Sequence, residues 1–408
     1  MMPAVIRVIV VVLLWLLVPA GVAAAASLEA LPTVILLSLD GVRHDYLDRG
    51  AGKLPALTRI ARQGARAEAL VPVFPSSTFP NHVTLATGTH PDRHGIVANR
   101  FFDRQREPGD FDYANDASWI EAEPLWVAAE RQGVRAASFF WVGSETDWRG
   151  AGASHRRAPF DSGVAESEKV DQILAWLDLP TTERPRLVLS WWHGADSAGH
   201  RFGPDAPETL RQLAGQDREL GRLLKGLDAR GAWAATTLLV VSDHGMASLA
   251  PGERIDARKV LRERGIGARV IPAGGLAHVF LEDASHGKLA REALAALPGV
   301  RAYPGDALPA ELRYAHPHRT GDLVAVTDPP RYFGSSRLLR RLEPRGGHGY
   351  EPSHPSMAGV FLALGRAVRP GLRLGRVRAL DVAATAAALL GIDPPRQSEG
   401  NSILPPAP

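Results

Sequence analysis

Three apolar runs, each closely followed by acids or histidines, constrain the fold of this 408-residue chain more than any other feature. They are Leu31–Leu39, Arg186–Trp192 and Thr236–Val241. Continuous apolar runs of this kind are typical of parallel strands that are buried on both faces. Helical patterns lie between them, at residues 54–64, 166–179 and 208–227. The alternation predicts an α/β fold with a mostly parallel central sheet flanked by helices.

Residues 246–345 break this alternation. Short strand patterns at 277–281 and 322–326 surround a helix pattern at 287–297. We therefore expect one catalytic domain over residues 27–408 that carries a small α+β insertion at about 246–345. A strand near 358–364 and a helix at 380–390 then continue the main pattern.

The first 26 residues have the pattern of a signal peptide. Arg7 supplies the positive charge, Val8–Leu17 the apolar region, and Gly21–Ala26 the small residues of a cleavage site. The apolar region is shorter than the roughly 20 residues of a membrane span, so an uncleaved anchor is the less favoured alternative. We expect a periplasmic or secreted protein with no stable membrane anchor after cleavage.

Composition narrows the chemistry. The chain has no cysteine, which excludes disulfides, thiolate metal sites and cysteine nucleophiles. Any metal must therefore be held by histidines and carboxylates. The formal charge of +3 is scattered along the chain, and no recognition motif accompanies it, so we expect no dedicated nucleic-acid partner.

Six candidate metal ligands lie at the ends of the predicted strands or in loops. They are Asp40, Asp196, His200, Asp243, His244 and His348. Open α/β sheets bind ligands outside the carboxyl ends of their strands, which predicts that these side chains share one site. Histidine nitrogens and carboxylate oxygens are zinc ligands, and six of them suit two ions. Taken singly, Asp40-Gly41 could be an ordinary turn and Asp196 a helix cap.

A nucleophile is predicted at Thr78, which precedes Phe79-Pro80-Asn81-His82. Proline is favoured in the first turn of a helix, and free N–H groups at a helix start bind phosphate. Coordination to zinc can activate a hydroxyl without a separate base. The alternative is that Thr78 only caps the helix.

Together these motifs resemble the nucleotide pyrophosphatase/phosphodiesterase family, the type I phosphodiesterases of the alkaline phosphatase superfamily. The matching segments are Thr78–His82, Thr87-Gly88, His94–Asn99, Asp196–His200, Ser242–Met246 and Gly347–Tyr350. They occur in the family's order between about Pro32 and Ile392. The resemblance implies an alkaline phosphatase-like fold, here in a bacterial secreted member.

The resemblance also implies two Zn²⁺ ions per chain and a role for each site residue. One ion would be held by Asp196, His200 and His348, and the other by Asp40, Thr78, Asp243 and His244. Thr78 would attack phosphorus and form a covalent phosphothreonine, which water then hydrolyses.

Around these ions, Asn99 would stabilise a phosphoryl oxygen and Phe79 would lie at the base pocket. A second aromatic wall has its best match in Phe160, with Trp148 as the alternative. The segment Trp192–Ala195 replaces an acid-rich stretch of many relatives, so the support around Asp196 is expected to differ.

We therefore expect a hydrolase of phosphodiester or pyrophosphate bonds in small-molecule nucleotides. A lipid or choline-headgroup phosphodiesterase, or a phosphonate or monoester hydrolase, is an alternative because related enzymes share the metal core. A metal-bearing envelope protein without catalysis belongs to a different class. It is disfavoured because every expected ligand and the nucleophile are present.

Overall fold

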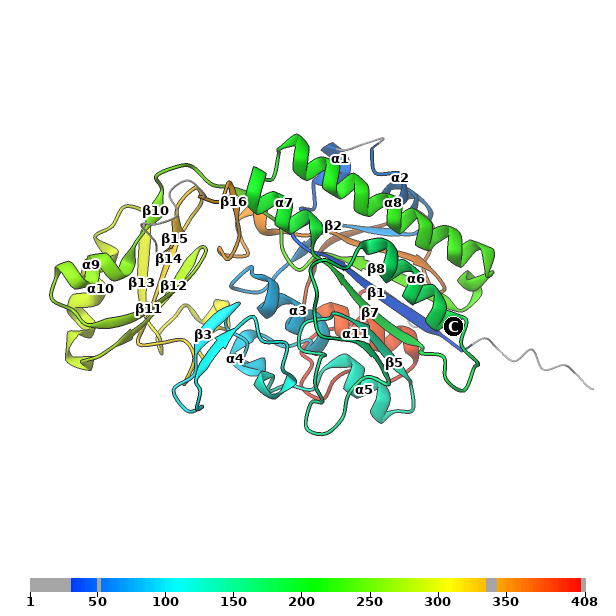
Figure 1. The fold of residues 1–408 in the computed structure, drawn as a ribbon, viewed down its shortest axis with the longest axis horizontal. Coiled ribbons are helices and arrows are strands. Elements are labelled where there is room, and N and C mark those ends of the chain that lie inside the picture. The colour runs from blue at the N-terminus through cyan, green and yellow to red at the C-terminus, as the bar shows by residue number, and fades with distance from the viewer. Residues whose placement is uncertain (1–30, 50–52, 335–342, 405–408) are drawn as a thin grey trace, which may run out of the picture. The chain divides into compact units, whose positions relative to one another are not determined.

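The computed structural model describes residues 31–49, 53–334 and 343–404, so the predicted signal peptide lies outside the described residues. Its central feature is an eight-stranded sheet with the order β18-β2-β17-β8-β1-β7-β5-β6 (Figure 1). The strands are β1 (Thr33–Leu39), β2 (Ala65–Val71), β5 (Ala136–Phe139), β6 (His155–Arg157), β7 (Leu187–Trp192), β8 (Thr236–Val241), β17 (Phe361–Gly365) and β18 (Leu372–Arg378). β17 pairs antiparallel with β2 and β8, and the other neighbours pair in parallel. The predicted mostly parallel sheet is confirmed.

Helices cover both faces of this sheet. One group packs together through the long helix: α2 (Pro55–Gln63), α6 (Glu166–Leu177), α7 (Gly194–Phe202) and α8 (Pro207–Ala229). A second group contains α3 (Thr78–Thr87), α5 (Leu125–Arg131) and α11 (Asp381–Leu390). Short helices α1 (Tyr46–Arg49) and α4 (Pro91–His94) lie in the connections. Among the described residues, no helix has the length and apolar character needed to cross a membrane.

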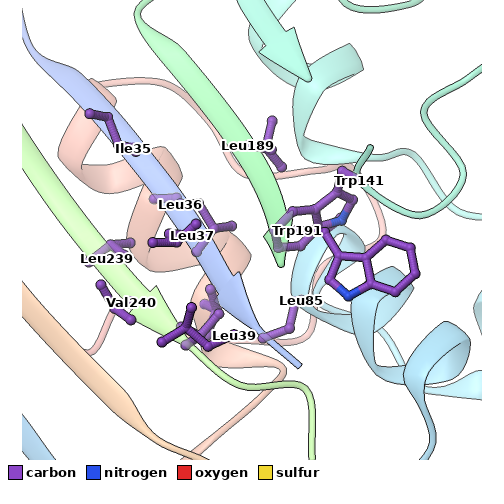
Figure 2. Packing of buried hydrophobic residues seen from close by; sticks show 14 of the residues in the cluster. Ile35, Leu36, Leu37, Leu39, Leu85, Trp141, Leu189, Trp191, Leu239 and Val240 are labelled. Carbon is purple, nitrogen blue, oxygen red and sulfur yellow. The ribbon is translucent and has the colours of Figure 1, made fainter. Parts of the chain in front are cut away.

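Strand β1 lies at the centre of the hydrophobic core. All seven of its residues are buried, and Leu36 and Leu39 pack near Leu239 and Leu85 from neighbouring elements (Figure 2). Fully burying a large aliphatic side chain contributes roughly 1.5–3 kcal/mol, so this core strongly favours the folded positions of β1, β7 and β8. The ends of these strands are thereby held in place.

The predicted insertion contains its own four-stranded antiparallel sheet, with the order β11-β12-β14-β13. Its elements are α9 (Ala257–Glu263), β11 (Ala268–Ala273), β12 (Leu276–Leu281), α10 (Gly287–Ala295), β13 (Val300–Pro304) and β14 (Leu323–Thr327). A separate apolar cluster that includes Val270, Val279 and Leu294 fills it.

Three two-stranded sheets complete the described fold. They pair β3 (Arg100–Phe102) with β4 (Asp110–Asp112), β10 (Arg254–Ile255) with β15 (Tyr332–Phe333), and β9 (Ala247–Ser248) with β16 (Gly346–Gly347). The β9–β16 pair joins the two ends of the insertion. It brings the chain after residue 347 back to the end of β8.

Candidate active site

The ends of β1, β7 and β8 lie level with one another. Leu39 pairs with Trp192, and Ser38 pairs with Trp191 and with Val241. Asp40 directly follows β1, Asp243 lies two residues after the end of β8, and α7 begins close by with Asp196 in its first turn. Gly41 has a φ of +69°, and a Cβ on it would lie 3.0 Å from the Cα of Asp196. The Asp40-Gly41 turn is therefore part of the site, because glycine allows Asp196 to come close.

Thr78, Asp40, Asp243 and His244 form the first part of the cluster, and all are buried. The Nε2 atom of His244 lies 3.1 Å from Asp243 Oδ2 and 3.5 Å from Asp40 Oδ1. The same nitrogen lies 3.2 Å from Thr78 Oγ1. The hydroxyl thus faces the same point as both carboxylates.

Asp196, His200 and His348 form the second part. His200 Nε2 lies 3.5 Å from Asp196 Oδ1 and 3.1 Å from His348 Nε2. Since Asp196 and His200 are one turn apart on α7, they face the same side of that helix. The rings of His244 and His348 stack with centroids 3.9 Å apart, so the two parts adjoin. The structure brings all six predicted ligands and Thr78 into one cluster.

All three histidines present the same nitrogen to the cluster. The Nδ1–H groups of His200, His244 and His348 donate to the carbonyls of Gly346, Gly245 and Ser76, at 2.9, 2.8 and 3.2 Å. These bonds fix the ring orientations and leave each Nε2 lone pair facing inward. Burial and the neighbouring histidines hold the pKa of His348 well below its usual value, which favours the neutral, ligating form.

The carboxylate oxygens of the cluster indicate what it binds. Asp40 Oδ1, Asp196 Oδ1 and Asp243 Oδ2 are buried without a hydrogen-bond partner among the described residues. Burial raises the pKa of Asp40 well above its usual value, and the charges of Asp243 and Asp196 raise it further. Buried polar oxygens normally have partners, and metal ions would supply them here. Two overlapping sets have ligand atoms within 4.8 Å of one another: Asp40, Asp243 and His244, and Asp196, His244 and His348. The donors therefore fit metal binding, and nitrogen and oxygen donors of this kind suit zinc.

Helix α3 begins at Thr78, and the N-cap position belongs to Ser77. The Asn81 side chain holds the preceding loop: its Oδ1 accepts from the Val73 N–H at 2.7 Å, and its amide donates to the Ser77 carbonyl at 3.0 Å. The Thr78 N–H makes no hydrogen bond within the described part of the chain. The Thr78 hydroxyl is therefore not used as a helix cap, and it lies beside a free N–H at a helix start.

Asn99 lies next to this helix start. Its Oδ1 accepts the Phe79 N–H at 2.8 Å, which leaves the side-chain amide as the group able to donate. The Tyr113 backbone N–H donates to the Asn99 carbonyl at 3.0 Å. Asn99 is thus held from two sides.

The predicted base-facing role of Phe79 does not fit its placement. Its ring is only 2% exposed and packs edge-on against Phe111 and Tyr113, at 5.8 and 5.4 Å. A ring enclosed in this way has no open face for a base. Tyr113 is 49% exposed and is the aromatic side chain that faces outward at this position.

Phe160 lies behind Asp40, a candidate metal ligand. Its ring stacks on Trp191 at 4.8 Å, and the Trp191 indole N–H donates to Asp40 Oδ2 at 2.8 Å. The alternative, Trp148, is buried and donates to the Ile120 carbonyl at 2.9 Å. Of the two, Phe160 is the one connected to the site through a single intervening side chain.

Sequence reasoning assigned no role to Trp191 or His82. The His82 Nδ1–H donates to the Thr78 carbonyl at 2.9 Å and lies 3.4 Å from Asp243 Oδ2. Its ring lies edge-on to Trp141 and Trp191, which Figure 2 shows close to α3. Its place one helical turn after Thr78 is the signal that could have identified it.

His193 lies in the segment Trp192–Ala195, where the resemblance predicted a different environment around Asp196. It lies against the Phe160 ring at 5.5 Å, and its Nδ1 is buried without a partner among the described residues. Phe160 therefore packs against this stretch, and the carboxylate of Glu166 also lies close to it, 3.0 Å from a Cβ built on Gly194.

Comparisons with known proteins agree with this geometry. Residues 34–351 match the family described as type I phosphodiesterase/nucleotide pyrophosphatase. An uncharacterised pyrophosphatase/phosphodiesterase of Schizosaccharomyces pombe is 34% identical over 82% of this chain and 71% of its own length. A bis(5′-adenosyl)-triphosphatase of Mus musculus is 28% identical over 95% of this chain and 84% of its own length. The chain also matches longer curated relatives from human, rat and mouse, and the matches cover 41%, 43% and 42% of the lengths of those proteins.

The fold is shared with a solved relative. An inactive variant of murine ectonucleotide pyrophosphatase/phosphodiesterase 5, in complex with AMP, superposes with a TM-score of 0.82 at 26% identity. The match covers 91% of this chain and 97% of that one. From the family match, the shared fold and the assembled ligand cluster, the chain belongs to the type I phosphodiesterase/nucleotide pyrophosphatase family of hydrolases.

Proposed function

We propose that this protein hydrolyses phosphodiester or pyrophosphate bonds of nucleotides, with Thr78 as nucleophile and two zinc ions as cofactors. The observation that carries the proposal is the position of Thr78 Oγ1, 3.2 Å from His244 Nε2 at the start of α3. The AMP bound to the solved murine relative supports a nucleotide substrate.

Asp40, Asp243 and His244 would hold one ion beside Thr78, and Asp196, His200 and His348 would hold the other. When bound, the ions lower the pKa of the hydroxyl and neutralise charge on the phosphoryl group. The inward Nε2 atoms and the unpartnered carboxylate oxygens are the donors that support this assignment.

The chain's own residues perform the remaining steps. Thr78 Oγ attacks phosphorus, the bond to the leaving oxygen breaks, and a phosphothreonine diester forms. Water then attacks the same phosphorus, the bond to Thr78 Oγ breaks, and the nucleoside monophosphate is released. The Asn99 amide and the Thr78 N–H would donate to a phosphoryl oxygen, where charge builds up.

Replacement of the nucleophile tests this proposal. Thr78→Ala should stay folded and bind zinc, while its diesterase rate falls by several orders of magnitude, and Thr78→Ser should retain part of the activity. Metal content, thermal unfolding and hydrolysis of a thymidine nitrophenyl diester are the measurements. Full activity in Thr78→Ala would refute the mechanism. A wild type that hydrolyses only nitrophenyl phosphorylcholine or a nitrophenyl monoester would refute the nucleotide assignment.

We also propose that the protein is exported, with a periplasmic or secreted location. The support is the signal-peptide pattern of residues 1–26. Recovery of the protein only from the cytoplasmic fraction of its native host would contradict export, and sequencing its N-terminus would show whether residues 1–26 are removed.

A further inference from the structure

One stretch of the chain carries positive charge alone. Residues 366–378 contain five arginines and no acid, and they form β18 together with the turn that precedes it. β18 is the outermost strand at one end of the central sheet. None of these residues belongs to the candidate active site.

Three of the five arginines lack an acidic partner. Arg369, Arg373 and Arg376 are exposed, and none of them forms an ion pair with another described residue. Arg378 differs, because it pairs with Asp381 at 2.6 Å. Three guanidinium groups are therefore available to a partner outside the chain.

The neighbouring elements add charge of the same sign. The Leu372 N–H donates to the Gly64 carbonyl at 3.1 Å, which places the start of β18 beside the end of α2. Arg62 lies in the last turn of α2, and it is also exposed and without an ion pair among the described residues. The four unpaired side chains form a surface that we call the arginine edge: Arg62, Arg369, Arg373 and Arg376.

The arginine edge works against the stability of the sheet. Arg373 lies directly beside Arg66 of β2, and like charges side by side on neighbouring strands are destabilising. Asp48 neutralises Arg66 at 2.7 Å, but Glu68, the acid on β2, forms no ion pair with another described residue. A local cost of this kind is typical of a surface that is retained for binding.

The outer layer of this edge is cationic and not apolar. Leu372 and Leu374 pack against the core, and no exposed large apolar side chain of the described chain lies between residues 366 and 378. Protein–protein interfaces normally have aromatic or aliphatic anchors at their centres. Guanidinium groups bind phosphate oxygens through pairs of N–H donors. The chemistry of the edge therefore fits a phosphate-bearing surface.

The shape of the edge favours a layer of lipid headgroups over a nucleic acid. Proteins usually read duplex DNA with a helix or a two-stranded ribbon that enters a groove, whereas β18 is held in the sheet by its pairing with β2. Cationic side chains are attracted to an anionic membrane surface without any shaped pocket.

Binding at the arginine edge would take place away from the ligand cluster. In the strand order β18-β2-β17-β8-β1, β18 lies four positions from β1, the strand that precedes Asp40. At about 4.8 Å per strand, the two are about 19 Å apart. A surface bound at β18 therefore leaves the chemistry at Asp40 unchanged.

We propose that the arginine edge docks the protein on the anionic phosphate headgroups of a lipid bilayer. The contact is electrostatic and reversible, and it needs no membrane-spanning segment. It holds the enzyme at a membrane surface while substrate reaches the active site from solution. This inference does not depend on the proposed nucleophile or metals.

Vesicle binding by the full chain tests this inference. Wild type should bind vesicles of equimolar phosphatidylglycerol and phosphatidylcholine more tightly than vesicles of phosphatidylcholine alone. Each arginine near an anionic surface contributes about fivefold in affinity, so Arg369→Gln, Arg373→Gln and Arg376→Gln together should weaken binding to the anionic vesicles about 100-fold. The corresponding lysine variant keeps the charge and should stay within about tenfold of wild type.

Three arginines of the insertion provide a matched control. Arg262, Arg264 and Arg291 are exposed and form no ion pair in the described part of the chain, so their replacement by glutamine removes the same formal charge from another surface. Because salt screens charges beyond about 10 Å, this control should keep the vesicle affinity within about twofold. All of these variants should hydrolyse a thymidine nitrophenyl diester in solution at the wild-type rate.

Four outcomes would overturn the docking surface. They are equal binding of wild type to both kinds of vesicle, equal losses in the two glutamine variants, a lysine variant as weak as the glutamine variant, and binding of duplex DNA in place of vesicles. Self-association of the Arg369, Arg373 and Arg376 glutamine variant, without vesicle binding by wild type, would assign these arginines to protecting an edge strand. Thr78→Ala should bind vesicles as wild type does, so failure of docking and failure of the proposed function are distinguishable.

Discussion

Trp191 connects the hydrophobic core to Asp40, a proposed zinc ligand, and its replacement by phenylalanine should weaken zinc binding. The indole N–H donates to Asp40 Oδ2 at 2.8 Å, and Asp40 is 1% exposed, so water cannot replace this bond. A hydrogen bond to a charged group contributes about 1.5–3 kcal/mol. At 1.4 kcal/mol per tenfold change, Trp191→Phe should weaken zinc binding by about 10- to 150-fold.

The next residue on the same strand provides a matched control. Trp192 is also buried, but its indole N–H donates to Ser190 Oγ at 3.1 Å, and Ser190 is not in the ligand cluster. Trp192→Phe loses similar ring volume and a neutral hydrogen bond, so zinc affinity should change by no more than about twofold. Competition with a chromophoric chelator measures both affinities.

The pH dependence adds a second readout. The Trp191 hydrogen bond lowers the pKa of Asp40, against the larger upward effect of burial. Its removal therefore raises that pKa further, and protons compete with zinc up to a higher pH. Zinc release on acidification should begin at a higher pH in Trp191→Phe than in Trp192→Phe. Identical affinities and identical release curves for the two variants would refute the reasoning.

Three further predictions concern other residues. In metal-free protein, Asp40→Asn should raise thermal stability, because the buried carboxylate disfavours folding when it is ionised. The gain should be absent below about pH 4 and should grow as pH rises towards the elevated pKa of Asp40. A difference in melting temperature between variant and wild type that does not change with pH would contradict it. Asn99→Ala should lower kcat by about 10²–10³-fold in steady-state assays, and an unchanged kcat would remove Asn99 from the site. Tyr113→Ala should raise KM for a nucleoside diester about tenfold without changing KM for a small aryl methyl diester. Phe160→Ala should have the same effect if its ring forms the opposite wall of the base pocket. Equal losses on both substrates would mean that these rings support the fold and do not contact the base.

The elements that sequence patterns predicted well are those with a strong period or a complete apolar run. β1, β7 and β8 lie within two residues of the predicted runs because each is buried on both faces. β18 was missed because it is an edge strand of the central sheet, and its exposed, arginine-containing positions break the apolar signal. Burial and length together decided which strands were visible in the sequence, since β5 is fully buried but has only four residues and was also not predicted.

The candidate site also contains some residues whose placement could be predicted and others whose placement could not. The convergence of the six candidate ligands could be predicted because their residue types are chemically selective and they lie at strand ends or in loops next to them. The position of the Phe79 ring could not, since Phe111 encloses it from the β3–β4 hairpin, for which no pattern was recognised. Tyr113 follows that hairpin with a φ of 47°, in a region that local sequence patterns do not describe.

The return of the chain through β16 has a consequence for biogenesis. His348 is separated from His244 by the whole insertion, so a polypeptide emerging from a ribosome or an export channel passes through a stage with Asp40, Asp243 and His244 present and His348 still absent. Pairing of β16 with β9 then closes a contact between residues about one hundred positions apart, which is slow relative to local folding. Stabilisation by a metal that needs His348 is available only after this closure.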